Sequence, residues 1–296
     1  MIIFLFSQTA LIIYVPTFKS DKSIDYDALR VLIEYLICND CDYLVVLGTT
    51  AETPTLSKDE RQDIKDFVRK QVAGRVPLIV GHGGNNTMEL VEELKTGDFE
   101  GFSAILSVVP YYNKPSQEGI YQHYKAIAEA SPLPVILYNV PGRTGVNMSA
   151  DTTLRLAYAF ENIIGVKEAS GNITQMDDII KNKPSRFDVI SGDDGVTFPL
   201  LTLGAVGVIS VIGNAFPREF SKMVRLGLNG EYENARAIHH KFTELFSLLF
   251  VDGNPAGVKC ALHHMGFIEN ELRLPLVPTR IATNEKIHSV LKSLRG

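Results

Sequence analysis

Cysteine is scarce in this chain of 296 residues, which contains only Cys38, Cys41 and Cys260. An odd and sparse count argues against a disulfide framework and fits a reducing compartment, so we expect a cytoplasmic location. Cys38 and Cys41 have the spacing of half a zinc site, but no second ligand pair with matching spacing follows. The sequence therefore predicts ordinary thiols and no metal site.

The sequence also lacks basic runs and long apolar segments. The net charge is −5 at pH 7, and no cluster of Lys and Arg is present, which argues against a nucleic-acid partner. No segment reaches the roughly 20 apolar residues of a membrane helix, so we expect no membrane partner. The apolar start, residues 1–15, has no basic region before it and is interrupted at Ser7. It therefore favours a buried first strand over a signal peptide.

Short apolar runs alternate with longer amphipathic stretches along the chain. Runs of this kind are typical of parallel strands that are covered on both faces. The eight runs are residues 11–15, 43–47, 77–80, 104–108, 134–138, 163–167, 187–191 and 206–210. Eight strand–helix repeats predict an α/β fold of the (β/α)8 TIM-barrel type. An open doubly wound sheet is the alternative, but its Gly-x-Gly-x-x-Gly turn is absent after the first run.

Helical signals fill the stretches between the runs. Ser57 followed three residues later by Glu60 predicts a capping box, and Ser116 predicts a second helix start. After about residue 230 the strand signals end. Three C-terminal helices are expected there, over residues 231–250, 254–266 and 285–295. We therefore expect a barrel over residues 1–230 and a helical region over residues 231–296.

Lys167 ends the sixth apolar run. Active sites of such barrels lie at the carboxyl ends of the strands, so this lysine should point into the barrel mouth. Desolvation there would lower the pKa of the amine and give the free base that condenses with a carbonyl. On position alone, an ion pair of Lys167 with Asp193 or Asp194 is an equally good interpretation.

Polar residues at the ends of other runs offer further candidates, each with a structural alternative. Tyr138 ends the fifth run and could relay protons to Lys167, or be a core aromatic. Thr49 and Thr50 could bind a carboxylate, or form a routine turn. Arg143 lies in a loop with glycines and could hold a carboxylate through two hydrogen bonds. Its position alone favours a surface arginine.

Three motifs combine these residues: Gly48-Thr49-Thr50-x-Glu52, Tyr138-Asn139-Val140-Pro141 and Ile164-Gly165-Val166-Lys167-Glu168. With the stretches 110–119 and 141–145, they resemble the dihydrodipicolinate synthase / N-acetylneuraminate lyase family over essentially the whole chain. The last two stretches are similar to the synthase branch, and the sialic acid lyases differ where Arg143 stands. This resemblance implies condensation of pyruvate with aspartate semialdehyde in lysine and diaminopimelate biosynthesis. It implies no metal or organic cofactor.

The resemblance also implies roles for catalytic residues. Lys167 would form an imine with pyruvate, and Tyr138, Thr49 and Tyr112 would relay protons. Because Tyr112 would reach the site of a neighbouring subunit, a homo-oligomer is expected, typically a tetramer built as a dimer of dimers.

Binding roles follow from the same resemblance. Thr49 and Thr50 would hold the carboxylate of pyruvate, and Arg143 would hold that of aspartate semialdehyde. Gly192 and Ile209 would line the pocket.

A regulatory site is also implied by the resemblance, because family members are inhibited by lysine at a subunit interface. Asn85, Glu89 and Tyr111 match positions of that site. Lys58 and Arg61 stand where some inhibited members carry histidines. Two cations beside a site for a cationic inhibitor would weaken its binding, so we predict weak or altered inhibition by lysine.

The sequence departs from the family pattern at two places and leaves two other functions open. Ala51 replaces the usual glycine, which could shift Thr50 if that position needs a positive φ. Pro16-Thr17 reverses the usual order near the first strand. The other functions are cleavage of N-acetylneuraminate or a 2-keto-3-deoxy sugar acid, and a barrel that binds without catalysis.

Overall fold

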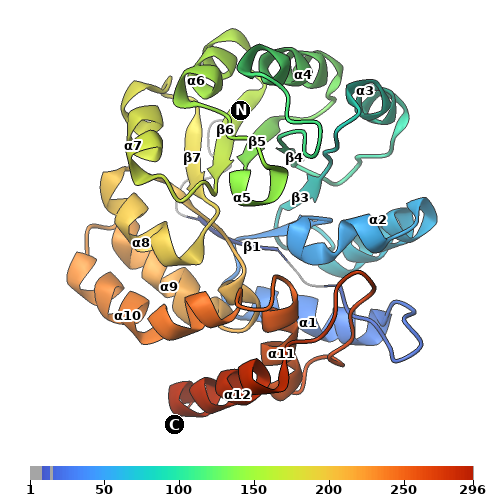
Figure 1. Cartoon of the computed structure of the whole chain (residues 1–296), viewed down its shortest axis with the longest axis vertical. Helices are drawn as coiled ribbons and strands as arrows, with labels where there is room; N and C mark the ends of the chain where they lie inside the picture. Colours follow the sequence, from blue (N-terminus) through green and yellow to red (C-terminus); the bar gives the residue numbers. More distant parts are fainter. Residues whose placement is uncertain (1–8, 14–15, 296) are drawn as a thin grey trace.

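Eight parallel strands form a closed barrel in the computed structural model, which describes residues 9–13 and 16–295. Each strand pairs with the next along the chain, and β8 returns to pair with β1. Figure 1 shows the helices arranged around these strands. The predicted (β/α)8 barrel is confirmed, and the open doubly wound sheet was the wrong alternative.

Each predicted apolar run falls on a strand. The strands are β1 (Thr9–Ile13), β2 (Tyr43–Val46), β3 (Leu78–Gly81), β4 (Ala104–Val108), β5 (Val135–Asn139), β6 (Ile163–Glu168), β7 (Asp188–Ser191) and β8 (Gly207–Ser210). The first run, residues 11–15, was placed two residues late, and residues 14–15 lie outside the described part. Pairing with both β2 and β8 sets the position of β1, and neither contact can be read from one run.

The helices begin where capping side chains were predicted. The hydroxyl of Ser57 accepts a hydrogen bond from the backbone N–H of Glu60, whose carboxylate accepts one from the N–H of Ser57. Ser116 caps α4 through its hydroxyl alone, which accepts a hydrogen bond from the backbone N–H of Gly119. The barrel helices are α1 (Tyr26–Cys38), α2 (Lys58–Val72), α3 (Thr87–Thr96), α4 (Gln117–Ala130), α5 (Pro141–Thr144), α6 (Ala150–Ala159), α7 (Ile173–Asn182), α8 (Asp194–Leu203) and α9 (Pro217–Leu228), with 3₁₀ turns η1 (Thr49–Ala51), η2 (Thr53–Thr55) and η3 (Ile212–Asn214).

Apolar side chains form two layers, one inside the barrel and one between strands and helices. Along β5, Ile136 and Tyr138 point inward and Val135 and Leu137 point outward. The pairing of β5 with β6 shifts register between Val135 and Ile136, which is the mark of a β-bulge. A one-residue shift exchanges the inner and outer faces of every following residue.

The three predicted C-terminal helices are present as α10 (Tyr232–Leu248), α11 (Ala256–His264) and α12 (Ile281–Arg295). They lie together on the lower side of the barrel in Figure 1, and α10 packs against α8 and α9. The start of α12 was predicted four residues late, because its first turn carries the exposed Ile281 and shows no apolar periodicity. Among the described helices, none combines the length and apolarity needed to cross a bilayer.

Candidate active site

The barrel brings Lys167 and Tyr138 side by side on neighbouring strands. The two residues are paired in the register of β5 with β6, so their side chains share the inner face. The bulge sets this geometry, because Ile164 lies in the inner layer and Val166 in the outer layer. Lys167 therefore points inward, and Glu168 points outward.

The amine of Lys167 is buried without a counter-charge. The residue is 2% exposed, and its Nζ lies 4.2 Å from the centre of the Tyr138 ring. Burial lowers the pKa of Lys167, and Tyr138 and Asp194 oppose this effect only in part. No carboxylate of the described residues forms an ion pair with Lys167, so the predicted alternative of a bond to Asp193 or Asp194 is not what the structure shows.

Thr49 and Thr50 lie in the short turn η1, directly after β2. Thr50 is buried, and its Oγ1 accepts a hydrogen bond of 2.9 Å from Nδ2 of Asn254. Ala51 has no positive φ, whereas Glu52 adopts the left-handed conformation with φ +44°. The methyl group of Ala51 therefore causes no strain in the turn, and the concern raised by the missing glycine is removed.

A cavity of about 530 Å³ opens at the carboxyl ends of the strands. This volume suits one or two small organic molecules. Six of the eight predicted catalytic and binding residues line it: Thr49, Thr50, Tyr138, Arg143, Lys167 and Gly192. Arg143 sits in α5 with an exposed side chain, and its Nη2 lies 3.5 Å from the carbonyl oxygen of Asn254. The cavity is therefore lined both by the buried amine of Lys167 and by the exposed guanidinium of Arg143.

Gly192 is required by close packing next to the lysine. A Cβ at this position would lie 2.7 Å from Cβ of Ala169 and 3.0 Å from Cε of Lys167. Any larger residue would push against the lysine chain, which is a reason for glycine at the end of β7. Ile209 is different, because it packs in the inner layer with Tyr138 and is not among the residues that line the cavity.

Two buried carboxyl groups stand near the lysine without forming ion pairs with it. Glu168, on the outer face, accepts hydrogen bonds from Asn139, Ser170 and Gln175, and burial raises its pKa. Asp194 accepts bonds from two backbone N–H groups after β8, and burial raises its pKa to about 6. Among the described residues, no group of three or more His, Cys, Asp or Glu is placed to hold a metal ion.

Comparison with known proteins shows the family of this chain. The model of the dihydrodipicolinate synthetase family matches residues 7–294. This chain belongs to the dihydrodipicolinate synthetase family. A 4-hydroxy-tetrahydrodipicolinate synthase from Parabacteroides distasonis is 71% identical over 280 residues, covering 95% of this chain and 94% of the relative.

Solved structures of dihydrodipicolinate synthases also match closely. The enzyme from Aquifex aeolicus has a TM-score of 0.93 at 41% identity, covering 97% of this chain and 98% of that chain. The chloride-inhibited enzyme from Acinetobacter baumannii, solved in complex with pyruvate, has a TM-score of 0.94 at 40% identity. It covers 97% of this chain and 99% of that chain.

Tyr112 lies apart from the cavity of its own chain. It is 88% exposed and has φ +72°, and it is not among the cavity-lining residues. Of the three residues predicted to relay protons, only Tyr138 and Thr49 therefore lie at the cavity of their own chain. The part predicted for Tyr112 at the site of a neighbouring subunit stays a prediction.

None of the predicted regulatory residues Asn85, Glu89 and Tyr111 is among those that line the cavity beside Lys167. Nδ2 of Asn85 donates to the carbonyl oxygen of Tyr111, at 3.3 Å, and Tyr111 lines a second cavity of about 410 Å³. Arg61 lines that cavity too. Nζ of Lys58 lies 3.9 Å from the carboxylate of Glu89.

Sequence reasoning missed the contribution of the C-terminal helical region to this family's site. Asn254 bonds Thr50 and contacts Arg143, and α10 lines the cavity through His239, Thr243 and Ser247. Those three residues recur every four positions, which places them on one helix face. That spacing was the only available signal, and it does not say what the face covers.

Proposed function

We propose that this protein is a lyase with 4-hydroxy-tetrahydrodipicolinate synthase activity. It condenses pyruvate with L-aspartate 4-semialdehyde through a Schiff base on Lys167, in lysine and diaminopimelate biosynthesis. The observation that carries the proposal is the buried, unpaired amine of Lys167 at a cavity that also holds Thr49, Thr50 and Arg143. The relatives' names and the pyruvate complex of a 40% identical enzyme support it.

The chemistry begins at the free amine, which burial favours by lowering the pKa of Lys167. The amine attacks the keto carbon of pyruvate, and water leaves to give a protonated imine. This cation withdraws electrons, so a methyl proton departs and an enamine forms. The enamine carbon attacks the aldehyde carbon, and the aldehyde oxygen takes up a proton. The amino group of the second substrate then displaces Lys167 and closes the ring, which restores the free lysine.

The protons in these steps need a carrier at the amine. Tyr138 carries its hydroxyl on the ring that lies beside the amine of Lys167, and we assign it proton transfer with Thr49 and with Tyr112 of a neighbouring subunit. Thr49 and Thr50 bind the carboxylate of pyruvate. Arg143, exposed at the mouth, binds the carboxylate of the semialdehyde.

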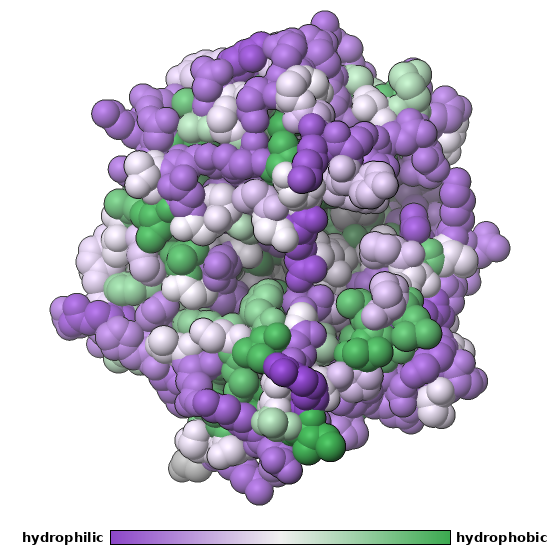
Figure 2. Space-filling view, in the orientation of Figure 1, coloured by the Kyte–Doolittle hydropathy of each residue, from purple (hydrophilic) through white to green (hydrophobic). Residues whose placement is uncertain are grey.

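The working form in this proposal is a homotetramer built as a dimer of dimers. The exposed ring of Tyr112 supports this, because large aromatic side chains at the surface are typical of interfaces. Figure 2 shows further hydrophobic patches in the lower part of the face, over the C-terminal helices. Three free cysteines support the proposed cytoplasmic location.

Weak inhibition by lysine is part of the same proposal. Asn85, Glu89 and Tyr111 would contact the inhibitor, but Glu89 already lies 3.9 Å from the ammonium of Lys58. A lysine ligand would have to compete with that cation. We expect inhibition only at millimolar lysine, measured as initial rates over a lysine titration. Half-inhibition at micromolar lysine would contradict this expectation.

The test is pyruvate consumption with aspartate semialdehyde, run beside pyruvate release from N-acetylneuraminate. We expect consumption only. Arg143→Ala should lower kcat/KM for the semialdehyde roughly 10- to 100-fold, the value of charge-assisted hydrogen bonds, and leave KM for pyruvate unchanged. Arg236→Ala, a surface change on α10, is the matched control. Release from the sugar acid, or no turnover at all, would overturn the proposal.

A further inference from the structure

An ion pair with both partners fully buried stands directly behind the turn that carries Thr49 and Thr50. Nζ of Lys259, in α11, lies 2.5 Å from Oε1 of Glu52, and both side chains are 0% exposed. Lys259 also donates to the carbonyl oxygen of Glu271, at 2.7 Å, and lies 4.3 Å from the centre of the Phe18 ring. The mechanism proposed above uses neither charge.

Glu52 is connected to the binding hydroxyls by a very short stretch of chain. It follows Thr50 by two residues and takes the left-handed conformation that ends η1. The hydroxyl of Thr53 bonds back to the carbonyl oxygen of Gly48, at 3.0 Å, which closes the loop on itself. A movement of the Glu52 side chain is therefore expected to move the backbone of Thr50 as well, because the loop between them is short and closed.

A residue two positions before the start of α11 contacts the same turn at a second point. Asn254, five residues before Lys259, donates from Nδ2 to Oγ1 of Thr50. The two contacts approach Thr50 and Glu52 from one rigid segment of the C-terminal region. The orientation of the Thr50 hydroxyl thus depends on where α11 sits.

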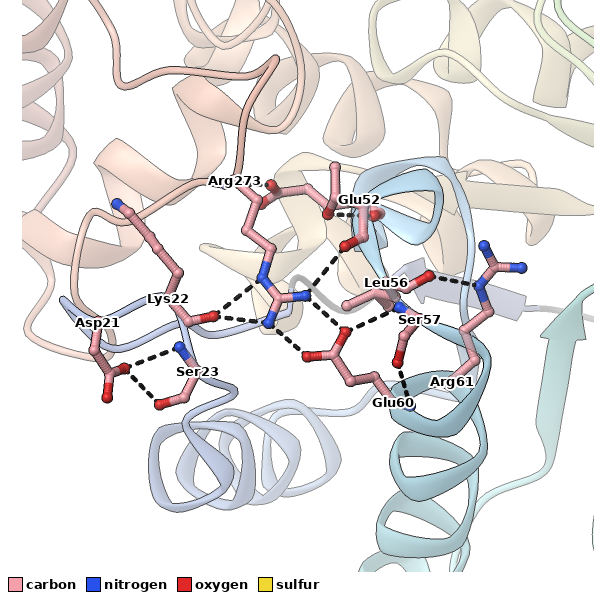
Figure 3. A network of polar contacts seen from close by, with 10 residues as sticks. Asp21, Lys22, Ser23, Glu52, Leu56, Ser57, Glu60, Arg61 and Arg273 are labelled. Atoms are coloured by element: carbon pink, nitrogen blue, oxygen red, sulfur yellow. Dashed lines mark hydrogen bonds and ion pairs between the residues drawn. The ribbon is translucent and has the colours of Figure 1, made fainter.

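Arg273 ties this assembly to the start of α2. Its backbone N–H donates to Oε2 of Glu52, at 3.1 Å, and its guanidinium forms two bonds of 2.7 and 2.6 Å to Glu60. Figure 3 shows this network, with Arg273 also bonded to the carbonyl oxygen of Lys22. The carboxylate of Glu52 is therefore held from two sides, by Lys259 and by Arg273.

We infer that Glu52 and Lys259 are positioning residues for pyruvate binding, which fix the Thr49–Thr50 turn relative to Lys167. This inference rests on the proposed function. Neither buried charge is stable without the other, so the pair fixes the distance between α11 and the turn. A shift of about 1 Å in a binding group can reduce catalysis on the order of 100-fold, so such a fixed distance matters for the rate.

The test uses the double variant Glu52→Gln/Lys259→Met, which removes both charges and leaves no lone buried ion. The concentration of active sites is measured by borohydride trapping of pyruvate. Rates are then expressed per imine-forming molecule, so unfolded protein does not lower them. We expect KM for pyruvate to rise about 10-fold and KM for the semialdehyde to stay within about twofold, because the turn and Arg143 are separate elements. A purely structural role would lower the melting temperature and leave both KM values unchanged.

Two further variants keep the outcome decisive. Glu52→Asp keeps both buried charges, shortens the side chain by one methylene group and gives the same reading if the double variant does not fold. Lys286→Met removes the exposed ion pair between α12 and α10 and should change neither KM. An unchanged KM for pyruvate in both Glu52 variants would overturn the inference. Failure of the native protein to trap pyruvate would instead overturn the proposed function.

Discussion

Lys167 and Lys259 are both buried, yet their surroundings differ in one decisive respect. Each ammonium lies over an aromatic ring, at 4.2 Å from the centre of Tyr138 and 4.3 Å from that of Phe18. Lys259 has the carboxylate of Glu52 at 2.5 Å, whereas Lys167 has no ion-pair partner among the described residues. Burial lowers the pKa of both, to about 8 for Lys259.

The comparison shows that burial alone does not make a lysine reactive. Lys259 is enclosed by protein groups that satisfy its charge, so it has neither the space nor the free electron pair for chemistry. Lys167 faces a cavity of about 530 Å³ and has no ion-pair partner among the described residues, and burial lowers its pKa, which favours the neutral amine where a substrate can reach it. The missing counter-charge is therefore the informative feature of the site.

Removing Lys167 should produce the largest change in activity. We expect Lys167→Met to lower kcat on the order of 10⁴-fold or more, the scale on which loss of a nucleophile acts. Borohydride with pyruvate should fix no adduct. Stability in urea should be unchanged or higher, because a costly unpaired amine is replaced by an apolar chain of similar volume. Substantial residual turnover of Lys167→Met, or a large loss of its stability, would contradict the expected difference between Lys167 and Lys259.

Removing Lys259 should act mainly on stability. We expect Lys259→Met to lower the free energy of unfolding by about 3–5 kcal/mol, because Glu52 is left as a buried lone charge. The double variant Glu52→Gln/Lys259→Met should recover most of that loss. Lys286→Met, at an exposed pair, should change it by less than about 1 kcal/mol. Urea unfolding of the four proteins would make the comparison, and equal effects at Lys259 and Lys286 would contradict it.

Asp194 extends the comparison to a buried acid without an ion-pair partner. Burial raises the pKa of Asp194 to about 6 in the folded state, from an ordinary value of 3.8. The protonated form is therefore favoured by folding, and this stabilisation is present below pH 4 and lost as pH rises through 6. At roughly 1.4 kcal/mol per pKa unit, the loss amounts to about 3 kcal/mol.

The measurement is urea unfolding from pH 4 to 7 in the native protein and in Asp194→Asn. We expect the difference in unfolding free energy between the two proteins to shift in favour of the variant as pH rises. Subtracting one profile from the other removes the titration of all other groups. A difference that does not vary with pH would show that Asp194 ionises normally.

Strand–helix alternation gave the barrel, its order of strands and the positions of most helices. Those features are local, because an apolar run of four or five residues and a capping serine act through their near neighbours. The prediction was wrong by two residues for β1, whose position is set by pairing with β2 and β8, and by four for the start of α12, whose first turn shows no apolar periodicity. The inward direction predicted for Lys167 is what the structure shows, but the bulge in β6 that sets this direction could not be read from the sequence.

The sequence by itself determined which residues stand at the ends of strands, and hence that Lys167, Tyr138, Thr49 and Arg143 belong to one face of a barrel. Periodicity and strand order are properties of the chain read in one dimension, so they suffice for that conclusion. Only the tertiary structure decided that Lys167 has no ion-pair partner in the described part of the chain while Lys259 has one. It also decided that Asn254 and Lys259, before and within α11, contact the turn that carries Thr50. Both depend on distances between residues about 200 positions apart, and no local pattern encodes such a distance.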